Sequence, residues 1–190
     1  MHPRPSFRAA ALLLALPLAF VPAVAAEPVR LVAADDRGVT LELALPTYTV
    51  GPPGEDGRSR LTAPGLAAGT PPGRPALPAA TTLVALPPGA LPVLGRIEGD
   101  AEETRDGVRL IIGDRRGFTE DVHGLGMVPF AEPVEPIRDG PWPAAAAELG
   151  VPFALRGQRM VAVTLRPFRY DEGVATLWAR RRMRRDEPHQ

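Results

Sequence analysis

Few side chains in this sequence are of the types that carry out covalent catalysis. After residue 26 the only serine is Ser59, the only histidines are His123 and His189, and the sequence contains no cysteine. A serine–histidine relay would require Ser59 beside one of these histidines, but Ser59 stands in a Gly/Pro-rich stretch without the context of a nucleophile elbow. Two histidines so far apart also lack zinc-binding spacing. We therefore expect no catalytic residue and no zinc site.

One acidic cluster has the composition of a calcium site or of a pair of catalytic carboxylates. Its members lie in and beside the segment 99–107, and they are Glu98, Asp100, Glu102, Glu103 and Asp106. An enzyme using these carboxylates is one alternative, and stabilisation by added metal in a thermal melt would favour it. Such charges also form the solvated surface of a hairpin loop, and we expect this simpler role. We accordingly assign no cofactor and no metal to the chain.

The first residues have the pattern of a secretory signal peptide. Residues 1–26 begin with two arginines, continue with an apolar run over 9–21, and end in small residues, so cleavage is expected after Ala25 or Ala26. A membrane anchor is the alternative, but two prolines interrupt the run and no basic stop-transfer flank follows it. We expect an exported protein, periplasmic or extracellular, that does not stay in the membrane after cleavage.

Charge and length limit the remaining function classes. The sequence has 190 residues with 22 basic and 22 acidic side chains, and residues 1–26 contain two arginines and no acid. The rest of the chain therefore carries a formal charge of about −2, which gives no basic surface for nucleic acid. Its length suits a single domain with its own core. Without cysteine, that domain must be held by packing and not by disulfides.

Alternating apolar residues predict a mainly β fold. A first hairpin is expected over 29–33 and 38–45, and a strand over 81–86 follows the long Gly/Pro-rich connection of residues 51–80. A second hairpin is expected over 93–98 and 108–112.

The second half of the chain completes the predicted fold. Residues 113–134 look irregular. Pro143 followed by the alanine run predicts one short helix that stops at Gly150. A last hairpin is expected over 161–170 and 174–179, with its turn at 171–173. The fold class is thus an antiparallel β-sandwich with one short helix.

Three stretches together resemble the propeptides of gingipain-type cysteine peptidases. Residues 28–43, PVRLVAADDRGVTLEL, resemble the opening hairpin of that family. Residues 73–90, GRPALPAATTLVALPPGA, are similar to its Gly-x-Pro-x-Leu-Pro segment with the apolar strand and Pro-Pro-Gly that follow. Residues 149–181, LGVPFALRGQRMVAVTLRPFRYDEGVATLWARR, resemble its closing block, and the order of the three stretches strengthens the resemblance.

The resemblance implies a non-catalytic role. In this family the propeptide is an all-β module that precedes an exported peptidase, assists its folding and blocks its active site until it is removed. The catalytic His and Cys belong to the downstream domain, and this sequence has no cysteine. The resemblance thus implies a gingipain-like cysteine peptidase as partner. An exported sandwich module that binds or adheres without a protease partner is the alternative, and the neighbouring reading frame would discriminate between them.

The resemblance also implies site residues. Inhibition in the family is attributed to a loop that offers a basic side chain to the specificity pocket, and Arg115 and Arg116 in GDRRGFTEDVHG are the candidates, with a solvated turn as the simpler interpretation. An arginine so placed could form a bidentate pair with a pocket carboxylate. Phe168, Arg169 and Tyr170 are candidate partner contacts, although Phe168 and Tyr170 could equally cover the end of the core.

The end of the sequence is rich in arginine. We expect a propeptide-like domain over residues 27–180 and an arginine-rich tail over 181–190. The run is a candidate processing site for an arginine-specific peptidase, with a solvated tail as the alternative. Its members are Arg180, Arg181, Arg182, Arg184 and Arg185.

Overall fold

The computed structural model describes residues 27–188 except 36–37, 70, 100–101 and 121–126. The signal-like segment 1–26, His123 and His189 lie outside the described residues. The described residues form β-strands and contain no helix, so nothing in this part of the chain has the length and apolar character of a membrane-spanning helix. The mainly β class predicted from the sequence is confirmed.

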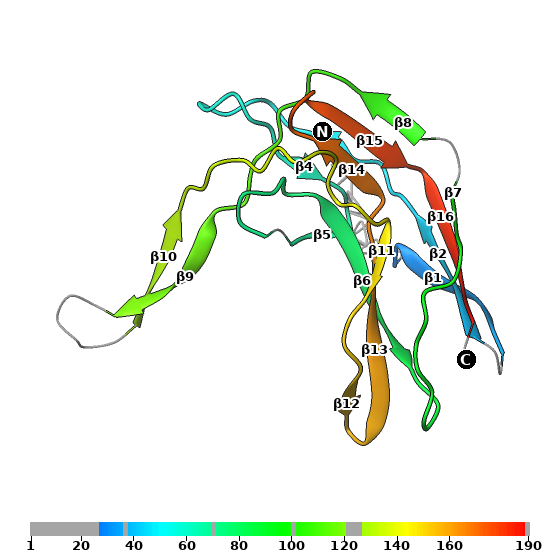
Figure 1. The fold of residues 1–190 in the computed structure, drawn as a ribbon. Helices are drawn as coiled ribbons and strands as arrows, with labels where there is room; N and C mark the ends of the chain where they lie inside the picture. Colours follow the sequence, from blue (N-terminus) through cyan, green and yellow to red (C-terminus); the bar gives the residue numbers. More distant parts are fainter. Residues whose placement is uncertain (1–26, 36–37, 70, 100–101, 121–126, 189–190) are drawn as a thin grey trace, which may run out of the picture.

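The first sheet has four strands in the order β1-β2-β16-β7 (Figure 1). They are β1 (Val29–Ala34), β2 (Gly38–Ala44), β16 (Arg182–Pro188) and β7 (Ile97–Gly99). The predicted opening hairpin is confirmed by the antiparallel pairing of β1 with β2. Its turn is closed by the Asp35 carboxylate, which accepts a hydrogen bond from the Gly38 N–H at 2.9 Å.

The second sheet has the order β11-β13-β6-β5, and β12 also pairs with β13. Its strands are β11 (Ala147–Leu149), β12 (Phe153–Leu155), β13 (Gln158–Leu165), β6 (Pro78–Ala85) and β5 (Ala67–Ala68). Alternation along β13 buries Val161, Val163 and Leu165 on one face, as the sequence predicts.

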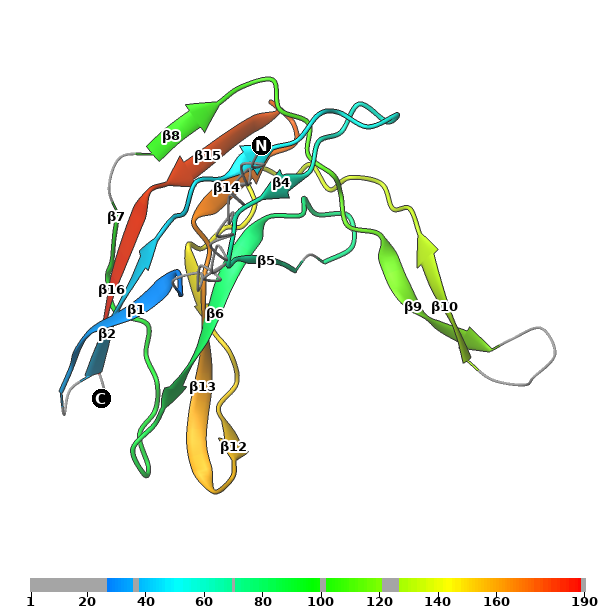
Figure 2. The same ribbon diagram turned by 180° about the vertical axis from the view of Figure 1, so that it is seen from behind.

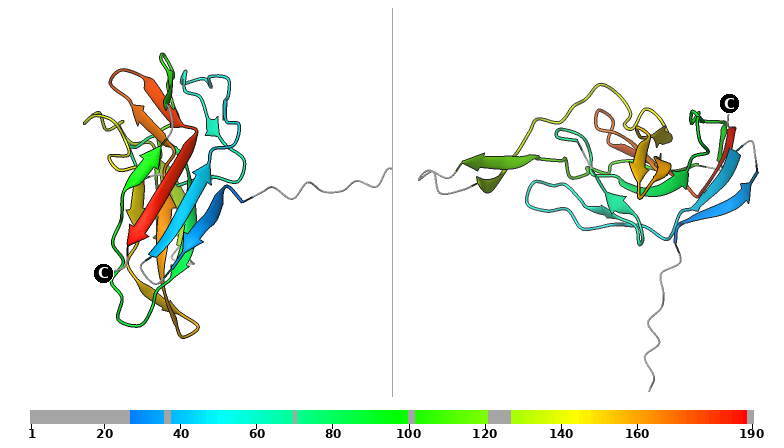
Figure 3. Two further views of the ribbon diagram at one scale, coloured as in Figure 1. Left: turned by 90° about the vertical axis from the view of Figure 1, so that its right-hand side faces the viewer. Right: turned by 90° about the horizontal axis from the view of Figure 1, so that it is seen from below.

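Packing of these two sheets makes the sandwich. In the left view of Figure 3 the four-stranded sheet faces the viewer and the second sheet lies behind it. The core between them takes Leu43 and Met183 from the first sheet and Val84, Val161 and Leu165 from the second. Each such side chain, once removed from water, contributes roughly 1.5–3 kcal/mol to folding before the entropy cost is counted.

A second apolar cluster lies under a smaller sheet. This sheet consists of β14 (Phe168–Asp171), β15 (Thr176–Arg180) and β8 (Glu102–Arg105), and the short pair β3 (Thr49–Val50) and β4 (Leu61–Thr62) lies nearby. Phe168, Tyr170 and Leu177 pack there against Leu61 and Leu110. The Gly/Pro-rich connection thus contributes to the core.

Two further strands stand apart from these sheets. Strand β9 (Arg115–Glu120) pairs with β10 (Met127–Glu132), and the hairpin projects from the rest of the molecule (Figures 1 and 2). The expectation of an irregular segment over 113–134 is therefore wrong. We call this hairpin the projecting arm.

The predicted short helix is also wrong. Ala147–Leu149 is a strand, β11, that pairs with β13. Four alanines are too few to nucleate a helix in isolation, and burial of Ala147 in the core decides the conformation. The N–H of Arg166 donates to the carbonyl of Ala146 at 2.8 Å, which ties this segment to the sheet.

The predicted hairpin of 93–98 with 108–112 does not form. Instead β7 pairs with β16, and β8, which the sequence placed in a polar loop, pairs with β15. Glu102 of β8 lies opposite Arg180 of β15 and pairs with it, so the charge of this polar strand is compensated by a basic neighbour far along the chain.

The last predicted hairpin is correct only in its second half. Strands β14 and β15 pair as expected, but β13 pairs with β6 and not with the strand that follows the turn. The chain changes sheets at Pro167, which has no N–H for a continuing ladder. The expected tail also takes a different form, because Arg182–Pro188 is strand β16.

Candidate functional site: the projecting arm

The arm is a two-stranded ribbon whose outer edges are open. Among the described residues β9 pairs only with β10, in register from Met127 opposite Glu120 to Glu132 opposite Arg115. Six residues of strand extend about 20 Å. A ribbon with two unpaired edges offers rows of N–H and C=O groups that another protein chain can bind.

Arg115 and Arg116 lie at the start of β9, at the base of this ribbon. Both side chains are exposed, and because they are successive strand residues they point to opposite faces. Arg116 lies 3.8 Å from Asp114, but its side chain is 78% exposed, so this pair holds it only weakly. The sequence placed these arginines on a loop, whereas they lie in strand β9, and their inhibitory role remains a prediction.

Gly117 allows the two strands of the arm to approach. A Cβ at this position would lie 2.7 Å from Cε1 of Phe130, which is its register partner on β10. The Phe130 ring is half-buried against this glycine. Pro129 is tolerated beside it because an edge strand needs no donor on its outer side.

The base of the arm is fixed by Gly73 and Arg74. The Gly73 N–H donates to the Gly113 carbonyl at 2.9 Å, and the Gly73 carbonyl accepts from the Ile137 N–H at 2.8 Å, so one residue joins both ends of the arm. Gly73 has a φ of 77°, and a Cβ would lie 3.0 Å from Ile137 Cγ1. Only glycine fits this conformation and this space without strain.

Arg74 reinforces the same base. Its guanidinium forms a bidentate pair with Asp139, with Nη2 to Oδ2 at 2.7 Å, and lies 4.8 Å from the centre of the Trp142 ring. The hydrogen bond from Arg74 lowers the pKa of Asp139 below its ordinary value. The base of the arm is thus stabilised by an ion pair and an aromatic contact that the sequence did not reveal.

The acidic cluster acts as a set of counterions. Glu102 pairs with Arg180 at 3.2 Å, and Glu103 pairs with Arg105 and Arg181 at 3.0 Å each. Asp106 accepts a hydrogen bond from Thr176 Oγ1 at 2.7 Å. Asp100 lies outside the described residues, and no group of three potential metal ligands occurs among those that are described.

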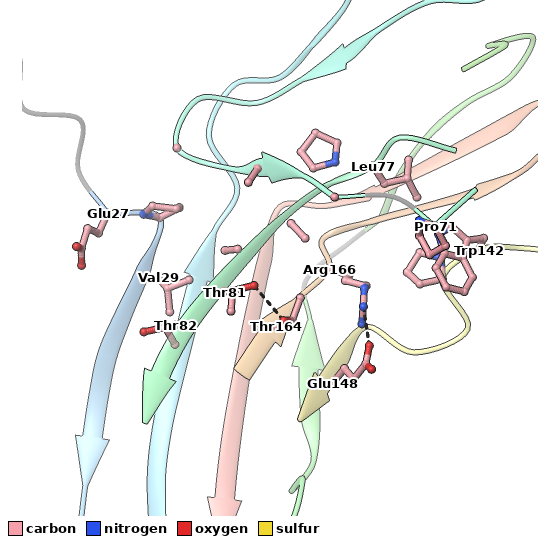
Figure 4. A pocket seen from close by; sticks show the side chains of 18 residues that line it. Glu27, Val29, Pro71, Leu77, Thr81, Thr82, Trp142, Glu148, Thr164 and Arg166 are labelled. Atoms are coloured by element: carbon pink, nitrogen blue, oxygen red, sulfur yellow. Dashed lines mark hydrogen bonds and ion pairs between the residues drawn. The ribbon is translucent and has the colours of Figure 1, made fainter. Parts of the chain in front are cut away.

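One pocket is lined by residues outside the arm's strands. It has a volume of about 710 Å³, and Thr81, Thr164 and the ion pair Glu148–Arg166 are among its lining (Figure 4). The pair joins Arg166 Nη2 to a Glu148 carboxylate oxygen at 2.6 Å. The residues that line the pocket include neither serine nor histidine.

Comparison with solved structures decides what this architecture resembles. A chain in the complex of Porphyromonas gingivalis RgpB pro- and mature domains matches with a TM-score of 0.68 and 17% identity, over 86% of this chain and 85% of that chain. This is a gingipain-propeptide-like fold. A structure of gingipain K from P. gingivalis, described as insight into its zymogenic latency, matches with a TM-score of 0.63 and 18% identity, over 85% of this chain and 92% of that chain. Comparison with protein-family models and with curated proteins gives no match.

The propeptide-like domain buries two of the three candidate partner contacts. Phe168 and Tyr170 are each 1% exposed in the second core, whereas Arg169 is exposed and lies 5.4 Å from the Trp178 ring centre. This arrangement matches the alternative in which the aromatic pair covers the core. Ser59 is buried as well, and its backbone bonds to Arg109 and Ile111.

The candidate residues of the propeptide-like domain lie on separate elements. Arg115 and Arg116 are on the arm, residues 168–170 are on β14, and the arginine run extends from the end of β15 into β16. Sequence reasoning missed Gly73, Arg74 and Gly117, because their roles depend on contacts with distant residues. The sequence signal for the arm was Gly117, because a glycine inside a strand often marks a close approach of another segment.

Proposed function

We propose that this chain is an exported, non-catalytic domain that inhibits a gingipain-like cysteine peptidase and assists its folding. The fold supports this proposal, since the matching chains come from a complex of RgpB pro- and mature domains and from a structure concerned with the latency of gingipain K. The absence of cysteine from the sequence agrees with a chain that provides no thiol nucleophile of its own.

The observation that carries the proposal is the projecting arm. It presents two exposed arginines on a ribbon that has no further strand partner among the described residues, and hydrogen bonds to Gly73 fix its base. A peptidase binds its substrate as an extended strand, so the edge of such a ribbon can occupy the same groove. Arg115 or Arg116 would then form a bidentate pair with a carboxylate in the specificity pocket.

Inhibition of an arginine-specific gingipain-like peptidase by the purified protein tests the proposal. We expect inhibition at micromolar concentration. Replacement of both Arg115 and Arg116 by alanine should raise the inhibition constant at least tenfold, which corresponds to about 1.4 kcal/mol of binding free energy. The single variants show which face of the arm enters the pocket, because the two side chains point in opposite directions.

Arg156 provides the matched control. It is an exposed arginine in the turn between β12 and β13, on a different element from the arm, and Arg156→Ala should leave inhibition unchanged. If the double arm variant inhibits as strongly as the unaltered protein, the arm is not the inhibitory element. If the unaltered protein does not inhibit at all, a binding module without a protease partner becomes the better description.

The remaining parts of the proposal have their own tests. Folding assistance predicts a higher yield of active peptidase when it is refolded in the presence of this domain. Export predicts that the protein recovered from the periplasm or medium starts after Ala25 or Ala26, which intact mass spectrometry can determine.

A further inference from the structure

The arginine run extends from the end of β15, at Arg180, into β16, which contains Arg182, Arg184 and Arg185. Strand β16 pairs with β2 from Arg182 to Pro188 and with β7 from Met183 to Arg185. The carbonyl of Arg181 accepts the N–H of Leu45 at 2.9 Å, and the N–H of Arg180 donates to Pro167 at 2.9 Å. The backbone of the run is therefore engaged along its length.

Acidic side chains form ion pairs with successive arginines of the run. Arg180 pairs with Glu102 at 3.2 Å, Arg181 with Glu103 at 3.0 Å, and Arg182 reaches Glu42 at 3.8 Å. The register continues the pattern, since Arg184 lies opposite Glu98 on one side and Glu42 on the other. We call the three carboxylates Glu42, Glu102 and Glu103 the acidic lining.

Met183 anchors the strand in the middle of the run. It is 1% exposed and belongs to the core between the two large sheets. Exposed ion pairs such as Arg181–Glu103 are each worth less than about 1 kcal/mol, so they position the strand, while burial and pairing hold it.

Cleavage of a folded protein requires a segment to open so that it can enter the peptidase groove. Exposed turns open easily, and paired central strands open rarely. Arg156 is of the first kind, because it is exposed in a turn with a φ of 51°. Arg180 and Arg182 are closer to the second kind, because they end β15 and begin β16, and both strands are paired. Arg181 lies between them and is held by the bond from its carbonyl to the Leu45 N–H, although the sequence of all three is that of a basic cleavage site.

We propose that the folded domain closes its own arginine run to arginine-directed cleavage, and that β16 must leave its place between β2 and β7 before the run is cut. The acidic lining lowers the frequency of this opening. If the closure controls when a propeptide is cleaved, that regulatory role rests on the proposed function. The closure itself is a property of this domain alone.

Limited digestion of the purified protein with trypsin tests the closure without any natural partner. Intact mass spectrometry over time should show cleavage after Arg156 at least a hundredfold faster than cleavage after Arg180, Arg181 or Arg182. Equal rates at the two places would overturn the proposal. Because trypsin replaces the peptidase, failure here is distinguishable from failure of inhibition by the arm.

Removal of two of the three carboxylates of the acidic lining separates the effect of charge from that of burial. The double variant Glu102→Gln/Glu103→Gln should raise cleavage in the run about tenfold while the rate at Arg156 stays constant, and 1 M NaCl should act in the same direction. Glu148→Gln is the matched control, since it removes a comparable ion pair with Arg166 on the other sheet. An unchanged rate in the double variant would mean that the carboxylates do not close the run.

Loosening the core beneath the strand provides a further readout. Met183→Ala leaves a cavity under β16 and should accelerate cleavage in the run more than at Arg156, while the circular dichroism spectrum stays that of a folded β protein. Hydrogen exchange covers the case in which this variant fails to fold. In the unaltered protein the amides of residues 183–185 should be among the most protected, and rapid exchange there would overturn the proposal.

Discussion

Arg58 donates a hydrogen bond to Glu172 at 2.6 Å, and the two residues lie 114 positions apart in the sequence. A second bond from the same guanidinium reaches the carbonyl of Leu110 at 2.6 Å, and Tyr170 Oη donates to the other Glu172 oxygen at 3.0 Å. This network joins the Gly/Pro-rich connection, the segment after β8 and the β14–β15 turn beside the second core.

Breaking this pair should be costly. The side chains of Arg58 and Glu172 are only 14% and 5% exposed, so Arg58→Ala leaves a carboxylate largely out of water without its partner. We expect a loss of about 3 kcal/mol in the free energy of unfolding, measured by urea denaturation. Glu148→Gln, which breaks a more exposed pair, should cost less than about 1 kcal/mol. Similar losses in both variants would contradict the importance of burial.

The same network predicts loss of stability in acid. Burial alone would raise the pKa of Glu172, but hydrogen bonds from Arg58 and Tyr170 outweigh it and the pKa lies below its ordinary value. A lowered folded-state pKa stabilises the protein above the ordinary glutamate value of about 4.3, and this contribution disappears as pH falls through the folded-state pKa. Urea denaturation between pH 6 and pH 3 should show a shallower decline for Glu172→Gln than for the unaltered protein. Parallel declines would count against this assignment.

A complementary effect is expected in alkali. Burial, together with the bond to Glu172, raises the pKa of Tyr170 to about 12. A raised tyrosine pKa stabilises the folded state fully below the ordinary value of about 10, and the contribution is lost as pH rises from there through about 12. Tyr170→Phe should flatten the fall in stability between pH 9 and pH 11. In an absorbance titration, the variant should lack the tyrosine that ionises near pH 12.

Crowding at the base of the arm makes a separate prediction. Gly73→Ala must adopt a positive φ and also place a Cβ 3.0 Å from Ile137. Gly140 also has a positive φ, but nothing lies within 4 Å of its Cβ position, so Gly140→Ala incurs only the backbone cost of about 1 kcal/mol. We expect Gly73→Ala to be the more destabilising and the only one of the two to weaken inhibition. Equal effects of the two substitutions on stability and inhibition would show that Gly73 does not position the arm.

Local sequence rules were sufficient where partners are close in the chain. The β1–β2 hairpin and the buried face of β13 follow from alternation and from turn residues such as Asp35. The fold resemblance was also visible in short motifs. These features depend on neighbours only a few residues away.

The rest was hidden because it depends on distant charges and contacts. The polar strand β8 carries almost no apolar signal, and its partner strand β15, with Arg180 opposite Glu102, lies far along the chain. The alanine run was assigned to a helix because propensity does not include the edge of β13. Likewise, Gly73 acquires its role only when both ends of the arm reach it.

The place of β16 in the first sheet has a consequence for how the chain folds. The strands β2 and β16 are neighbours, yet Glu42 and Arg184 are roughly 140 residues apart, which is a contact of very high order. Until the last strand has been synthesised, β2 and β7 each have an unpaired edge, and such edges are templates for association with other chains. Because β16 follows the other three strands of this sheet in the sequence, the sheet stays incomplete until the arginine-rich strand has been synthesised.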